Sequence, residues 1–107
     1  MSKGFGLGSS KKKLNVKQIY LVKKFAKGEK YYIAKNYSKA ESIFLDLKDS
    51  GYEDPNLFLY LSNIYIFNGS DEKARICLMS ALISNPDNPN IYFSLGTIHF
   101  KRNEFNI

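Results

Sequence analysis

The sequence repeats itself at an interval of 34 residues, and this periodicity restricts the available folds more than any other feature. Residues of similar size or role recur at this interval: Gly28, Ser62 and Gly96; Tyr31, Tyr65 and His99; Ala40 and Ala74; Phe44 and Leu78; Leu47 and Ala81. A repeating unit of this length cannot bury its apolar side chains alone, so each unit is covered by its neighbours. We therefore expect a stack of similar units, in which the small residues let paired helices approach closely.

The repeat also carries the signals that begin and end helices. Asp54-Pro55 and Asn88-Pro89 each join an N-cap side chain to a proline suited to the first helical position. Between them, Asn68-Gly69 ends one helix, and Ser70 is placed to cap the next. The flanking apolar residues have helical rather than alternating spacing, which argues against a β-hairpin at Asn68-Gly69. We predict five helices, over residues 15–35, 38–50, 55–67, 71–84 and 89–101.

The second and third units carry a recognisable motif. Phe58-x-x-Leu61-Ser62-x-x-Tyr65 is followed by Ala74-x-x-x-Leu78-x-x-Ala81 and by Pro86, and the third unit has Tyr92-x-x-Leu95-Gly96-x-x-His99. This pattern resembles the tetratricopeptide repeat of bacterial proteins, in registers 21–54, 55–88 and 89–107. The resemblance implies an all-α fold, a right-handed α-solenoid of antiparallel helix pairs with about five helices. The first register departs from the motif at Lys27 and Tyr52, so we expect it to be a weakened terminal repeat.

The two ends of the chain differ from the repeat. Residues 1–14 are rich in Gly, Ser and Lys, which predicts a disordered basic leader, whereas residues 15–107 form the repeat domain. The third register is incomplete because it stops before its second helix. We therefore expect a fragment of a longer array, with Leu95 and Ile98 of the uncovered last helix available for self-association.

Composition bounds the class of protein. A chain of 107 residues is one domain at most, and its eight Phe and eight Tyr provide ample core. The net charge of +6 is uneven, because residues 1–30 contain nine Lys against one Glu. A single cysteine, no signal peptide and no apolar stretch of membrane-spanning length lead us to expect a soluble protein of the reducing cytoplasm.

A binding groove follows from the resemblance, which implies that the first helix of each repeat lines the inner surface of the superhelix. We call the position of a residue within the 34-residue repeat its phase. The phases that face the inner surface are occupied by Phe25, Glu29, Tyr32, Asn56, Leu59, Asn63, Phe67, Asn90, Phe93, Thr97 and Lys101, with Val22, Ile33, Ile66 and Phe100 beside them. Such an aromatic and amide-bearing lining suits a protein partner or an extended peptide bound through its backbone. Solvated asparagines and aromatic side chains that only pack would give the same pattern, and both interpretations remain open.

One family function can be tested by residue type. Members of the family that clamp acidic chaperone tails use Lys, Asn and Arg at defined positions of the repeat. In this sequence those positions are occupied by Phe25, Glu29, Tyr60, Asn90 and Ser94. None of these residues is a cation, and Glu29 would repel a terminal carboxylate. We therefore expect a different ligand.

No pattern points to catalysis, a cofactor or a metal site. His99 shares the phase of Tyr31 and Tyr65, so we expect it to pack between helices rather than to act as a base. Cys77 lies on the apolar stripe of its helix, where a buried thiol with no nearby cation is inert. The glycine-rich residues 4–11 lack the preceding strand and the Gly-Lys-Ser/Thr ending of a phosphate-binding loop. We expect a binding module rather than an enzyme.

Two other functions compete with peptide binding. The basic residues 11–30 interleave aromatic residues with lysines, a pattern that could bind nucleic acid or an anionic membrane. Against this, Ile19, Val22 and Ala26 form a stripe that we expect to pack on the following helix, so we expect neither as a partner. Resembling bacterial proteins also place such repeats before a glycosyl- or sulfotransferase domain, where this array would present a substrate protein to an enzyme.

Overall fold

The structure, a computed structural model that describes residues 13–105, is all-α with no strand in that part of the chain. Its helices are α2 (Val16–Ile33), α3 (Tyr37–Asp49), α4 (Pro55–Phe67), α5 (Asp71–Ser84) and α6 (Pro89–Phe105). The predicted bounds of α4 and α5 are confirmed, whereas α6 continues past residue 101. Of the expected basic leader at residues 1–14, only Lys13 and Leu14 lie within the described residues, and neither is helical.

Side-chain caps begin α4 and α6, as the sequence predicts. The Asp54 carboxylate accepts a hydrogen bond from the backbone N–H of Asn56 at 2.9 Å. Asn88 Oδ1 accepts one from the backbone N–H of Asn90, also at 2.9 Å. Because each bond satisfies a backbone donor in the first turn, each fixes where its helix begins.

The turn between α4 and α5 differs in part from its prediction. Gly69 has a φ of 81° and supplies the left-handed conformation expected of it. Ser70 is the N-cap of α5 but makes no hydrogen bond with its side chain. Asp71 and Glu72 lie in the first turn, where negative charge favours the positive end of the helix dipole.

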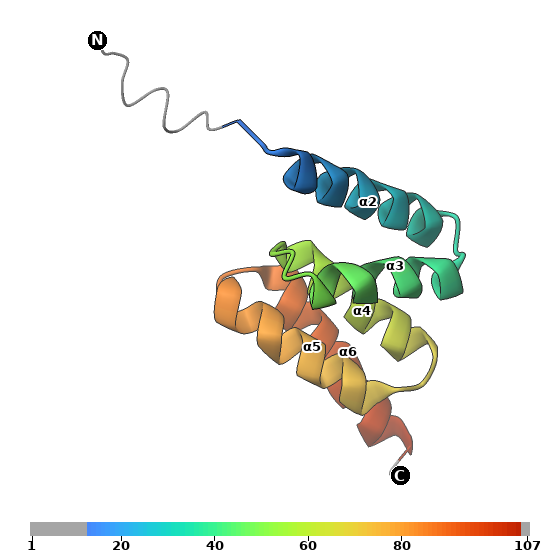
Figure 1. Ribbon diagram of the computed structural model, residues 1–107. Helices are drawn as coiled ribbons and strands as arrows, with labels where there is room; N and C mark the ends of the chain where they lie inside the picture. Colours follow the sequence, from blue (N-terminus) through green and yellow to red (C-terminus); the bar gives the residue numbers. More distant parts are fainter. Residues whose placement is uncertain (1–12, 106–107) are drawn as a thin grey trace.

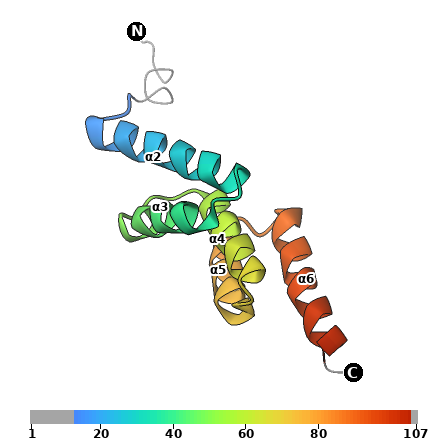
Figure 2. The same ribbon diagram turned by 90° about the vertical axis from the view of Figure 1, so that its right-hand side faces the viewer.

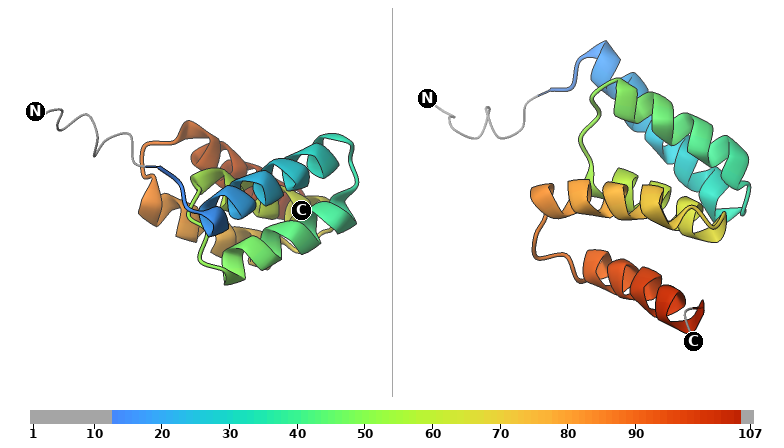
Figure 3. Two further views of the ribbon diagram at one scale, coloured as in Figure 1. Left: turned by 45° about the horizontal axis from the view of Figure 1, so that its top comes forward. Right: turned by 90° about the horizontal axis from the view of Figure 1, so that it is seen from below.

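Helices α2 and α3 form one antiparallel hairpin, α4 and α5 form a second that packs on the first, and α6 lies against the second (Figures 1 and 2). Each helix packs on the next along the chain, and α4 also packs on α6. The α4–α6 contact joins the first helices of two successive units. The radius of gyration is 17.0 Å, whereas a compact globule of this length has about 13 Å. The right-hand view of Figure 3 shows the layers in order, with α2 and α3 first, then α4 and α5, and then α6.

The core consists of two clusters rather than one. The first, between the two hairpins, has as buried members Phe25, Ala40, Phe44, Leu47, Leu57, Leu61, Ile64 and Cys77. The second, between α4, α5 and α6, has Leu59, Ala74, Leu78, Ala81, Ile91 and Ile98. Phe44 and Leu78, which share a phase in the repeat, are fully buried in different clusters. Burial therefore follows the periodicity of the sequence.

The small residues allow close packing in the first two units but not in the third. A Cβ atom on Gly28 would lie 2.6 Å from Cε1 of Phe44, so α2 approaches α3 more closely there than any side chain would permit. Ser62 is also fully buried. Gly96 is exposed, and a Cβ atom built there meets nothing within 4 Å. The prediction of close approach is wrong at Gly96, because no helix packs on that face within the described residues.

Two predictions for α6 are also wrong. Tyr31 and Tyr65 lie half-buried beneath lysines of the helices that follow them, but His99 at the same phase is exposed, since no second helix follows α6 in the described residues. Ile98, expected to be uncovered, is only 2% exposed because α6 packs on both α4 and α5. Up to residue 101, the large exposed apolar side chains of α6 are instead Tyr92, Phe93 and Phe100.

The expected packing of α2 on α3 is wrong in its choice of face. Ile19 and Val22 are 42% and 44% exposed, and Ala26 is exposed too. Phe25 and Gly28 face α3 instead and are buried. The stripe that was expected to be covered therefore lies on the solvent side of α2.

Candidate functional site

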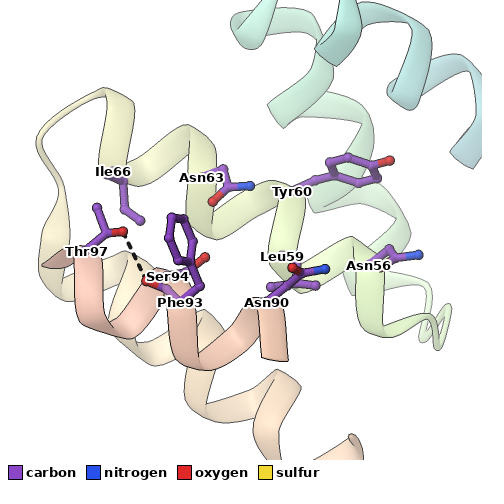
Figure 4. Close-up of a pocket in the computed structure, with 9 residues that line it drawn as sticks. All are labelled: Asn56, Leu59, Tyr60, Asn63, Ile66, Asn90, Phe93, Ser94 and Thr97. Carbon is purple, nitrogen blue, oxygen red and sulfur yellow. Dashed lines mark hydrogen bonds between the residues drawn. The ribbon is translucent and has the colours of Figure 1, made fainter. Parts of the chain in front are cut away.

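A cavity of about 460 Å³ opens between α4 and α6 (Figure 4). It is lined by Asn56, Leu59, Tyr60, Asn63, Ile66, Asn90, Phe93, Ser94 and Thr97. Three of these residues are asparagines that come from two successive units of the repeat. The cavity is thus formed by the pairing of first helices, where the resemblance places a ligand.

The size of one residue per unit explains why this gap is open. Ala26, Tyr60 and Ser94 lie at the same phase of the repeat. Tyr60 fills the space between α2 and α4, because its ring stacks on Phe44 with centroids 5.2 Å apart and its hydroxyl donates to Glu29 Oε2 at 2.8 Å. Ser94 on α6 is too small to do the same, so the space between α4 and α6 remains a cavity.

The structure brings together many of the predicted groove residues. Those that line the cavity are Asn56, Leu59, Asn63, Asn90, Phe93 and Thr97. Ile66, predicted to lie beside them, lines it as well. The lining from the second and third units is therefore continuous in space.

The other predicted groove residues lie elsewhere. Phe25 is only 7% exposed and packs in the first core cluster. Glu29 and Tyr32 lie behind the wall of the cavity, where they bond to lining residues of α4. Phe67 is 70% exposed and lies beside the ring of Tyr37, with centroids 4.8 Å apart.

Lys101, the last predicted groove residue, ties α6 to the preceding hairpin. Its Nζ lies 3.2 Å from Asp71 Oδ1 and 3.4 Å from the backbone oxygen of Ile66. The ammonium group is thus shared between the C-terminal part of α4 and the start of α5. It anchors α6 but does not line the cavity.

Tyr60 and Ser94 line the cavity although the predicted groove lining did not include them. Only the comparison with members that clamp chaperone tails placed these two residues at ligand-contacting positions. The signal that could have identified them is the change in size across Ala26, Tyr60 and Ser94. A large side chain followed by a small one at the same phase leaves unfilled volume between the first helices of the two units.

The lining carries amide, hydroxyl and apolar groups but no formal charge. Asn63 Nδ2 donates to the Tyr32 hydroxyl at 3.2 Å, which orients its carboxamide at the wall of the cavity. The carboxylate of Glu29 accepts a hydrogen bond from one lining residue, Tyr60. The site is suited to an uncharged segment with polar backbone groups.

The hydroxyl of Tyr60 should ionise at an unusually high pH. Burial first, and then the hydrogen bond to Glu29 and its negative charge, raise the pKa of Tyr60 to about 12. Since the unfolded chain ionises near the ordinary value of 10.0, this tyrosine stabilises the fold below that pH and the contribution is lost as the pH rises towards 12. Glu29→Gln should lower the pKa of Tyr60 without restoring the ordinary value, because burial remains.

Ultraviolet absorbance of tyrosinate against pH measures this effect, and Tyr60→Phe identifies the transition that belongs to Tyr60. A Tyr60 hydroxyl that ionises at its ordinary pKa would contradict its burial, and an unchanged pKa of Tyr60 in Glu29→Gln would contradict its contact with Glu29.

The described residues contain no group of three or more His, Cys, Asp or Glu placed to hold a metal ion. Cys77 is buried, as predicted, and burial raises the pKa of its thiol. The expectation that no cation is near this thiol is wrong, because Lys48 of α3 lowers the same pKa, although by less than burial raises it.

Comparisons with protein-family models, with curated proteins and with solved structures find no match. Among the described helices, none combines the length and the apolar character needed to cross a bilayer.

Proposed function

We propose that the chain is a tetratricopeptide-like binding module, a right-handed α-solenoid whose α4–α6 groove holds an extended segment of a partner protein. The observation that carries the proposal is the convergence of Asn56, Asn63 and Asn90 around one cavity. In this proposal the module works in the reducing cytoplasm, without a catalytic role.

The lining indicates how a peptide would be held. The Asn63 carboxamide oxygen can accept from a backbone N–H of the ligand while Nδ2 keeps its bond to Tyr32. Phe93 is 76% exposed at the mouth of the cavity and offers an aromatic surface for a ligand side chain. No cation lines the site, so a terminal carboxylate would find no counter-charge.

Asn63→Ala should weaken peptide binding about fivefold, the effect of one lost hydrogen bond. The probe is a peptide selected on the full chain from a displayed library of random sequences, and its affinity is measured by fluorescence anisotropy. The same substitution should leave the helical circular dichroism unchanged, because Asn63 is only half-buried.

Two control variants separate binding from structure. Asn68→Ala makes the same chemical change at the exposed C-cap of α4, outside the cavity, and should retain full affinity. Tyr32→Phe removes the internal bond of Asn63 but keeps its carboxamide, and should weaken binding less than Asn63→Ala does. Equal affinity of the Asn63 variant and the wild type, or selected peptides that do not compete with one another, would overturn the proposal.

A further inference from the structure

The solvent face of α2 carries an exposed apolar stripe. Ile19, Val22, Ala26 and Ile33 fall within an arc of about 60° when successive residues are placed about 100° apart. Ile33 is 75% exposed, and Val22 and Ile19 are 44% and 42% exposed. Within the described residues, α2 packs on α3 and reaches α4 through Glu29 and Tyr32, so this stripe has no cover.

A row of lysines runs beside the stripe. Lys23, Lys27 and Lys30 occupy the neighbouring arc of the same helix, and all three are exposed. Lys23 and Lys27 border a depression of about 280 Å³ that is completed by Tyr20, Lys24 and Ile43. Lys24 is tied to Asp46 at 3.4 Å, so the other lysines face solvent as the cationic rim.

We infer that this face of α2 docks on an anionic lipid bilayer, with the apolar stripe at the acyl boundary and the lysines among the headgroups. A helix with basic and apolar residues on one exposed side lies in the plane of the interface, because both kinds of residue then find matching surroundings. The depression bordered by the lysines gives a headgroup phosphate a concave basic site.

The apolar stripe distinguishes a membrane from nucleic acid. Lysines alone would serve either partner, since both present phosphates. A nucleic acid backbone offers nothing to Val22 or Ile33, whereas a bilayer buries them and gains from each buried methylene. A membrane partner was not expected as long as this stripe was predicted to pack on α3, but Ile19 and Val22 are exposed and free to contact a bilayer.

Vesicle flotation with the full chain tests the inference. The protein should float with vesicles of phosphatidylcholine and phosphatidylserine at low salt and remain unbound with phosphatidylcholine alone. The combined change Lys23→Gln, Lys27→Gln and Lys30→Gln should reduce partitioning about a hundredfold, at about fivefold per lysine. The pair Val22→Ser and Ile33→Ser should reduce it at least about tenfold.

Matched controls come from other helices. Ile83 is 85% exposed on α5, so Ile83→Ser removes at least as much exposed apolar surface as Ile33→Ser, but away from α2, and should not change partitioning. Lys73→Gln removes an exposed lysine of α5 and should be equally neutral. Asn63→Ala should also float as the wild type does, which keeps this result independent of the groove.

Three outcomes would overturn the inference. The first is no affinity for the anionic vesicles, and the second is flotation that survives the loss of Val22 and Ile33. The third is lysine-dependent, salt-sensitive binding to a duplex oligonucleotide together with no binding to vesicles, which would assign the lysines to nucleic acid.

Discussion

Phe44→Ala is expected to lower the free energy of unfolding by about 3–5 kcal/mol, the usual effect of removing a buried aromatic ring. Phe44 is fully buried, stacks on Tyr60 and lies 5.7 Å, centroid to centroid, from Phe25. It therefore joins three helices, and no small movement of one of them could refill its volume. Chemical denaturation followed by circular dichroism measures the change.

Phe100→Ala is the matched control, because Phe100 is 65% exposed on α6 and its removal leaves no cavity. The two variants lose the same atoms but differ in burial, so their stabilities should separate by most of the predicted effect. If both unfold at the same denaturant concentration, the first cluster is not packed as described.

The second large effect should come from the same substitution at two positions of the repeat. Gly28→Ala should destabilise the protein by about 1–3 kcal/mol, the typical result of overpacking a tight contact. The added Cβ would meet Phe44 Cε1 at 2.6 Å and Ile43 Cγ2 at 3.0 Å, and Phe44 is enclosed by other aromatic rings. Thermal unfolding of Gly28→Ala, and of Gly96→Ala for comparison, measures the change in stability.

Gly96→Ala should have the opposite sign. Gly96 lies within α6, where a Cβ atom would meet nothing within 4 Å. Alanine has the higher helix propensity, so this variant should be more stable by about 0.5–1 kcal/mol. Destabilisation by Gly96→Ala would mean that another element packs on Gly96, and tolerance of Gly28→Ala would mean that α2 does not approach Phe44 closely.

The opposite effects expected at Gly28 and Gly96 show that the repeat pattern predicts helices better than it predicts which positions are covered by a neighbouring helix. The pattern located every helix in the described residues, with bounds within two residues except at the end of α6, because N-caps, prolines and Gly69 act through their own local backbone. It also selected Phe44, Ala40 and Ala74 as core, since apolar residues of one helical face must be covered. It failed at Gly96 and His99, where phase alone implied a neighbouring helix.

The site was predictable to a similar degree. Phase identified most of the side chains that line the α4–α6 cavity, because residues one repeat apart occupy equivalent places on parallel first helices. It assigned Phe25 to the groove although that ring is buried, and it left out Tyr60 and Ser94. Which of the equivalent gaps is filled depends on side-chain volume and on hydrogen bonds such as that between Tyr60 and Glu29.

Periodicity, capping residues and glycine positions in the sequence were thus enough to specify an all-α chain of successive helices and the faces that need cover. Packing then determined which faces receive that cover: α2 turns Phe25 and Gly28 to α3 and leaves Val22 in solvent. The reason is that helix formation depends on neighbours along the chain, whereas burial depends on the shape of elements distant in sequence. The cavity of α4 and α6 and the basic face of α2 both arise from that second kind of contact.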